Sequence, residues 1–167
     1  HDTPDAVFDG RCPDSSRHEL LEKLSETVDH QRADLGIAFD GDGDRISVVA
    51  NDGVILRAEE TTAILLESFG EEIAGKPFVY DLKFSERLPE FAKSLKAQPL
   101  VERSGHSFLR TRMLESGARF GAEVSGHYFY GDLEGGDDAL YTACRLIHYA
   151  ASTGRSLSEL RRTFPEV

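Results

Sequence analysis

The sequence predicts an α/β fold in which helices sandwich a mixed, largely parallel sheet. Three observations lead to this prediction. The chain has 167 residues, 40% hydrophobic and 29% charged, as in an ordinary protein with a packed core. Short apolar runs alternate with longer stretches of helical periodicity. Polar loops directly follow several of these runs, as they do where ligands bind at the carboxyl ends of strands.

The first predicted element is an amphipathic helix within residues 15–32. Its apolar side chains, between Leu20 and Val28, recur at helical spacing on a charged background. Asp14 and Ser15 precede them and are candidate N-caps. One face of this helix is therefore expected to pack against the first strands.

Short apolar runs predict the remaining strands, and apolar side chains that recur every three to four positions predict the remaining helices. Two strands flank an acidic loop, and a hairpin-like Asn-Asp-Gly turn closes the second strand. In chain order, the elements are strands 35–39 and 46–50, helix 59–69, strand 78–81, helix 85–96, strand 100–102, helix 106–115, strands 119–124 and 127–130, and helix 137–152. We expect the loops after residues 39, 80, 101 and 124 to converge on one crevice.

The charge and cysteine content exclude several classes of protein. With 19 Lys and Arg against 30 Asp and Glu, the net charge is -11, which is unsuited to general nucleic-acid binding. The two cysteines are far apart and match no disulfide framework or zinc spacing, which favours a reducing cytoplasm. The apolar runs are far shorter than the roughly eighteen residues of a membrane span. We therefore expect a soluble, cytoplasmic protein with no nucleic-acid or membrane partner.

Residues 40–45, with the sequence DGDGDR, carry alternating carboxylates directly after a predicted strand. The candidate ligands are Asp40, Asp42 and Asp44. Carboxylate oxygens in this number suit a hard divalent cation such as Mg²⁺ or Ca²⁺. One alternative is a solvated acidic turn. An EF-hand is a poorer match, because Arg45 stands where its loop requires Gly and Asn51 where it requires Glu.

Four segments match one enzyme superfamily in the same order along the chain. They are ADLGIAFDGDGDR at 33–45, DLKFS at 81–85, ERSGHSF at 102–108 and GAEVSGH at 121–127. Together they resemble the motifs of the α-D-phosphohexomutases, the superfamily of phosphoglucomutase, phosphomannomutase and phosphoglucosamine mutase. The first resembles the metal-binding loop and the last resembles the sugar-recognition loop, with Ala122 where a second Gly is common.

The resemblance implies a central piece of a four-domain enzyme. Residues 1–54 would form the C-terminal part of domain 2, a partial α/β domain with the metal loop, and residues 55–167 would form domain 3. The first domain, with the phosphoserine that transfers the phosphoryl group, and the fourth, with a phosphate-binding loop, would be missing partners. The chain begins at His1 rather than Met, and this also leads us to expect a piece of a longer protein.

For the acidic loop, the resemblance implies a Mg²⁺ ion held by Asp40, Asp42 and Asp44 against the phosphoserine. The ion would neutralise charge on the group in transfer. Arg45 would offer a planar fork of donors to a phosphate. The alternative for Arg45 is a counter-ion that relieves repulsion among the three carboxylates.

Three basic residues lie in the next two motifs. By resemblance, Lys83 assists proton transfer at the reacting hydroxyl, and His106 lies near the reacting phosphate at the start of a predicted helix. Arg103 would add positive charge. Without the resemblance, Lys83 would be read as a solvated surface residue and His106 as a capping or partly buried histidine.

Glu123, Ser125 and His127 occupy alternate positions of the last motif. An extended segment would point all three side chains to one side. The resemblance assigns Glu123 and Ser125 to adjacent sugar hydroxyls, with His127 beside them near the reacting end. The alternative is a polar strand edge. Further along, Glu134, Asp137 and Asp138 are interpreted as a loop and a helix N-terminal capping cluster.

These expectations together describe an isomerase that interconverts hexose 1-phosphate and hexose 6-phosphate of mannose or glucose, through a hexose bisphosphate. Val124 disfavours the phosphoglucosamine mutase alternative, whose loop more often has Gln there. A non-catalytic module that binds a metal or a sugar phosphate is the alternative from another class. Since the phosphoserine motif is not among these residues, we expect the 167-residue chain alone to be inactive.

Overall fold

The main sheet of the protein has five strands in the spatial order β4, β3, β5, β6, β7. The structure is a computed structural model that describes Asp14 and residues 17–164. The strands are β3 (Pro77–Asp81), β4 (Gln98–Glu102), β5 (Phe120–Ala122), β6 (Tyr128–Tyr130) and β7 (Gly136–Asp137). Strands β4, β3 and β5 pair in parallel, and β6 is antiparallel to both its neighbours. Four strands thus share one direction, which confirms the predicted mixed, largely parallel sheet.

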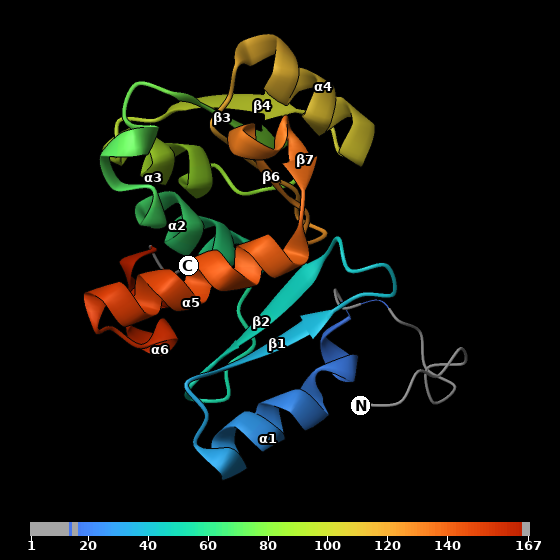
Figure 1. Ribbon diagram of the computed structural model, residues 1–167, viewed down its shortest axis with the longest axis vertical. Helices are drawn as coiled ribbons and strands as arrows, with labels where there is room; N and C mark the ends of the chain where they lie inside the picture. Colours follow the sequence, from blue (N-terminus) through green and yellow to red (C-terminus); the bar gives the residue numbers. More distant parts are fainter. Residues whose placement is uncertain (1–13, 15–16, 165–167) are drawn as a thin grey trace.

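Helices cover both faces of this sheet (Figure 1). They are α2 (Ala58–Ser68), α3 (Arg87–Ser94), α4 (His106–Ser116), α5 (Ala139–Thr153) and the short α6 (Leu157–Leu160). On one face, Phe78 and Phe120 pack into a core with α2, α3 and α5. On the other, Val79 and Phe129 pack against α4. The period-2 alternation of β3 therefore places one helical layer on each side, as the sequence predicts.

The N-terminal segment adds a helix and a hairpin beside the main sheet. Its elements are α1 (Glu22–Gln31), β1 (Leu35–Phe39) and β2 (Ile46–Ala50), and β1 and β2 pair antiparallel. Figure 1 shows this hairpin between α1 and α5. Ile46, Val48 and Ala50, on one face of β2, join the large core beside α2 and α5. The segment is therefore packed onto the rest of the chain by apolar burial.

Several elements differ from their predicted bounds. Helix α1 begins at Glu22 after a 3₁₀ turn at His18–Leu20, and the candidate cap Ser15 lies outside the described residues. Strand β5 ends at Ala122 because the chain turns at once. The 3₁₀ turns Gly70–Ile73, Gly131–Leu133 and Arg161–Thr163, as well as β7 and α6, were not predicted. Among the described residues, no helix combines the length and apolar character that crossing a bilayer requires.

Gly126 is the point at which the two parts of the chain make close backbone contact. Its φ of +97° is a conformation that side chains disfavour, and a Cβ there would lie 2.8 Å from the carbonyl oxygen of Ile46. Its own carbonyl accepts a hydrogen bond from the Ile46 amide at 3.2 Å. Only glycine allows this approach.

We predict that Gly126→Ala destabilises the protein more than a matched control. Gly117, at the end of α4, also has a positive φ of +62°, but no atom lies within 4 Å of a Cβ built there. Gly117→Ala should lower the free energy of unfolding by about 1 to 2 kcal/mol, and Gly126→Ala by clearly more, because it adds a backbone clash. Urea denaturation measures both values, and equal losses would contradict the prediction.

Candidate functional site

The acidic loop connects β1 to β2 and is folded around Asp40. Oδ1 of Asp40 accepts the backbone N–H groups of Gly43 and Arg45, both at 3.1 Å, and Oδ2 accepts Arg45 Nε at 2.6 Å. Burial alone would raise the pKa of Asp40, but the hydrogen bonds from Arg45 outweigh it and lower that pKa. Asp40 is therefore ionised and held in place.

Asp42 and Asp44 complete a group of carboxylates that can hold a metal ion. Ligand oxygens of Asp40, Asp42 and Asp44 all lie within 4.8 Å of one another. Burial raises the pKa of Asp44; His127 opposes this, but the charges of Asp40 and Asp42 add to it. A divalent cation would relieve this repulsion, so the loop fits a hard, oxygen-bound ion. The loop joins two strands, unlike the helix-flanked loop of an EF-hand.

Arg45 lies against carboxylates in this structure. Its guanidinium contacts Asp40 at 2.6 Å and Asp14 at 3.1 Å. The sequence left two roles open for Arg45, a phosphate ligand or a counter-ion to the carboxylates. In this structure Arg45 is the counter-ion. The backbone of Arg45 also forms an antiparallel bridge with His127, which brings the acidic loop next to the loop after β5.

The loop after β5 is a tight turn and not the extended segment that the sequence predicted. Gly126 N donates to Glu123 O at 3.1 Å, and Glu123 N donates to His127 O at 2.9 Å. The three predicted side chains nevertheless meet. Nδ1 of His127 lies 2.9 Å from Ser125 Oγ and 3.0 Å from Glu123 Oε2. The turn, rather than the alternation of a strand, brings them together.

The surroundings of Glu123 and His127 favour the charged form of both side chains. The hydrogen bond from His127 lowers the pKa of Glu123 although burial opposes it. For His127, burial lowers the pKa, but the hydrogen bond to Glu123 and the charge of Asp44 outweigh it and raise the pKa overall. An imidazolium beside a carboxylate offers both a donor and an acceptor to a polar ligand.

Asp81, at the end of the central strand β3, ties three loops together. Its side chain is fully buried. Oδ1 accepts the amide of Lys83 at 3.0 Å and the hydroxyl of Ser104 at 2.6 Å, and the amide of Val124 lies 3.4 Å from Oδ2. The loops after β3, β4 and β5 thus converge, as the sequence predicted. Asp81 was not among the predicted site residues, although its place at the end of an apolar strand is a signal.

The start of α4 lies against the same turn. Gly105 N donates to Glu123 Oε1 at 3.0 Å, and the rings of His106 and His127 lie 5.7 Å apart. Arg103 places its guanidinium over the ring of Phe108, 3.4 Å from the ring centre. His106 is thus in the site, and Arg103 lies on the exposed flank of the helix.

Asp137 is a member of the site that sequence reasoning assigned to helix capping. Asp138 does cap α5, since it accepts the amide of Tyr141 at 2.8 Å. Asp137 instead pairs with Phe129 across β6 and β7, and its Oδ1 lies 2.9 Å from His106 Nε2. No sequence signal marked the two-residue strand that carries it. Lys83, in contrast, is exposed in the turn after β3.

Two family models and several known proteins match the chain. The family model described as phosphoglucomutase/phosphomannomutase, alpha/beta/alpha domain III, matches residues 57–167, and the corresponding domain II model matches residues 1–53. The chain is 33% identical over 162 residues to phosphomannomutase/phosphoglucomutase of Pseudomonas aeruginosa, covering 96% of this chain and 35% of that protein.

Two further relatives indicate the same family. A phosphomannomutase of Methanocaldococcus jannaschii is 31% identical and covers 98% of this chain, which spans 36% of its length. The crystal structure of a phosphoglucomutase/phosphomannomutase family protein from Burkholderia thailandensis superposes with a TM-score of 0.89 at 32% identity, over 97% of this chain and 35% of that one. The chain thus spans about a third of the length of these relatives.

We predict that Asp81→Ala loosens all three loops at once. The substitution leaves partly buried donors without their acceptor, so it should lower the free energy of unfolding by about 1 to 3 kcal/mol. Hydrogen exchange at the amides of Lys83 and Val124 should accelerate. Asp29→Ala, on the exposed face of α1, is the control and should change stability by less than about 0.5 kcal/mol. Unchanged exchange at both amides in Asp81→Ala would refute the role of Asp81.

Proposed function

The chain belongs to the phosphoglucomutase/phosphomannomutase family, and on this basis we propose that it supplies the metal loop and the sugar loop of a phosphohexomutase. The parent enzyme would interconvert the 1-phosphate and 6-phosphate of mannose or glucose. The observation that carries the proposal is the junction between the two loops. Arg45 bridges to His127 through the backbone, and Asp44 Oδ1 lies 3.5 Å from His127 Nε2.

In this proposal, the acidic loop binds Mg²⁺. Asp40, Asp42 and Asp44 would hold the ion, which supplies electrostatic stabilisation of the phosphoryl group when bound. Support comes from the hard oxygen donors that lie within 4.8 Å of one another. Arg45 keeps Asp40 oriented and could turn to a phosphate when the site fills.

The turn after β5 would bind the sugar. Glu123 and Ser125 present a carboxylate and a hydroxyl, which can accept and donate hydrogen bonds to neighbouring ring hydroxyls. His127, which faces the acidic loop, would contact the reacting end and hold or move a proton there. The burial of Glu123 supports the assignment, because a nearly buried carboxylate aligned by Gly105 is preorganised for a ligand.

Three basic side chains flank the site and would act near the phosphate. His106 lies at the N-terminus of α4, where backbone amides favour an anion. Lys83 would transfer a proton at the reacting hydroxyl, and Arg103 would add positive charge. Their place at the ends of β3 and β4, beside the loops that Asp81 joins, supports these roles.

The domain division and the location complete the proposal. We assign residues 1–54 to the end of one α/β domain and residues 55–167 to the next, with the matched ranges 1–53 and 57–167 in support. The partners would be hexose phosphates, a hexose bisphosphate and two further domains of the parent protein. The exposed free thiol of Cys144 fits a cytoplasmic location.

We predict weak Mg²⁺ binding that depends on the acidic loop. Calorimetric titration of the chain should give a small heat that Asp42→Ala abolishes, because the loop loses one of three carboxylate ligands. Asp52→Ala removes a carboxylate from the turn after β2 and serves as the charge-matched control. Binding that persists in Asp42→Ala and is lost in Asp52→Ala would place the ion elsewhere.

We also predict that this chain binds hexose phosphates weakly through the turn after β5. In a titration of the ¹⁵N-labelled chain with mannose 1-phosphate or glucose 1-phosphate, amides of residues 123–127 should shift. Glu123→Gln should weaken the response, whereas Glu134→Gln, outside the site, should not. A stronger response to glucosamine 6-phosphate would favour the phosphoglucosamine mutase alternative, and no shift with any sugar phosphate would contradict the proposed function.

A further inference from the structure

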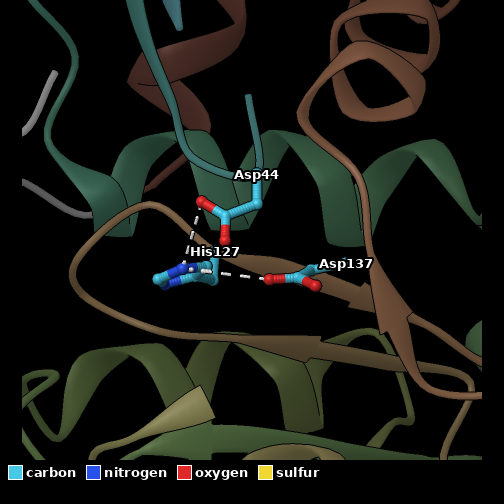
Figure 2. A group of neighbouring side chains, drawn as sticks. All are labelled: Asp44, His127 and Asp137. Carbon is cyan, nitrogen blue, oxygen red and sulfur yellow. Dashed lines mark ion pairs between the residues drawn. The ribbon is translucent and has the colours of Figure 1, made fainter. Parts of the chain in front are cut away.

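Three side chains from separate segments face one another beside the acidic loop. Figure 2 shows Asp44, His127 and Asp137 pointing toward a common space. Nε2 of His127 lies 3.5 Å from Asp44 Oδ1 and 3.9 Å from Asp137 Oδ2. Ligand atoms of all three lie within 4.8 Å of one another. The group shares only Asp44 with the three carboxylates assigned to Mg²⁺.

One oxygen of Asp137 has no hydrogen-bond partner. The side chain is only 9% exposed, and Oδ2 is fully shielded from solvent without a donor within hydrogen-bond distance among the described residues. Its other oxygen is engaged by His106 at 2.9 Å. A buried, unpaired carboxylate oxygen is costly, and an ion is one of the few ways to satisfy it. The unsatisfied atom faces His127 (Figure 2).

The surrounding contacts match those that orient metal ligands. A metal-bound histidine usually engages a carboxylate through its other ring nitrogen, and a ligating carboxylate is usually hydrogen-bonded as well. Here Nδ1 of His127 lies 3.0 Å from Glu123 Oε2, which leaves Nε2 facing the two aspartates. His106 supports Asp137 in the same way. Both supporting contacts exist without an ion.

We propose that Asp44, His127 and Asp137 form a second metal site, which binds a borderline divalent cation, best matched by Zn²⁺. Imidazole nitrogen and carboxylate oxygen are both zinc ligands, and three protein ligands with a fourth position open are typical of catalytic zinc sites. Bonds of about 2.0 to 2.2 Å in tetrahedral geometry put ligand atoms about 3.4 Å apart. Nε2 of His127 is 3.5 Å from Asp44 Oδ1, and its distance of 3.9 Å to Asp137 Oδ2 would shorten when the ion binds. Mg²⁺, which demands six oxygen ligands, fits this set poorly.

The negative charge around His127 also favours a bound cation at this site. Glu123, Asp44 and Asp137 surround the imidazole of His127. Three carboxylates leave the group negative even when His127 carries a proton and Arg45, 4.0 Å from Asp44, is counted. A protonated His127 that only forms ion pairs is the competing interpretation. It explains the contacts of Nε2, but it leaves the Asp137 oxygen at 3.9 Å, beyond a hydrogen bond.

Two variants separate this site from the acidic loop. We expect the untagged chain to bind Zn²⁺ in calorimetry, and Co²⁺ with a visible absorption spectrum typical of nitrogen and oxygen ligands. Asp137→Asn should weaken Zn²⁺ binding at least about tenfold and leave Mg²⁺ binding intact. Asp42→Asn should do the reverse, because it removes a ligand of the Mg²⁺ loop alone.

A measurement on the unsubstituted chain tests the proposal even if Asp137→Asn fails to fold. On addition of Zn²⁺, the ¹⁵N resonance of His127 Nε2 should shift, while His30 on the exposed face of α1 should not. Zinc binding lost in Asp42→Asn but retained in Asp137→Asn, or no shift at His127 Nε2, would overturn the proposal. These tests use no mutase activity, so their outcome is separate from that of the proposed function.

Discussion

The buried carboxylate of Asp81 is the interaction on which the site depends. Strand β3 lies between β4 and β5, so its last residue is next to both neighbouring loops. A fully buried carboxylate must be satisfied by donors, and those available come from the loops after β3, β4 and β5. The cost of an unsatisfied charge thus holds together three loops that are far apart in sequence.

A second contact joins the N-terminal hairpin to the three loops that Asp81 holds together. The turn that ends at Gly126 places its backbone directly on Ile46, and the bridge between Arg45 and His127 extends that contact. Apolar burial of β2 beneath α2 and α5 supports it from the other side. The acidic loop therefore meets the turn after β5 because both the backbone and the core hold them there.

The balance of charge explains why cations are expected at two places. Asp40 is satisfied by backbone amides and by Arg45, so it holds the loop in shape. Asp44 and Asp137 both face His127, and Asp137 also contacts His106. Arg45, 2.6 Å from Asp40 and 4.0 Å from Asp44, offsets only part of this local negative charge, in a chain whose net charge is -11.

The sequence by itself determined the α/β class, the order of most elements and the acidic loop, because hydrophobic periodicity and glycine-spaced carboxylates are local signals. It also pointed to Glu123, Ser125 and His127, although through an extended strand that the structure replaces with a turn. Only the tertiary structure revealed Asp81 as the link between loops and Asp137 as a partner of His106. Those roles depend on pairing between strands that are distant in sequence. The residues next to Asp81 and Asp137 in the chain do not indicate which strands will pair.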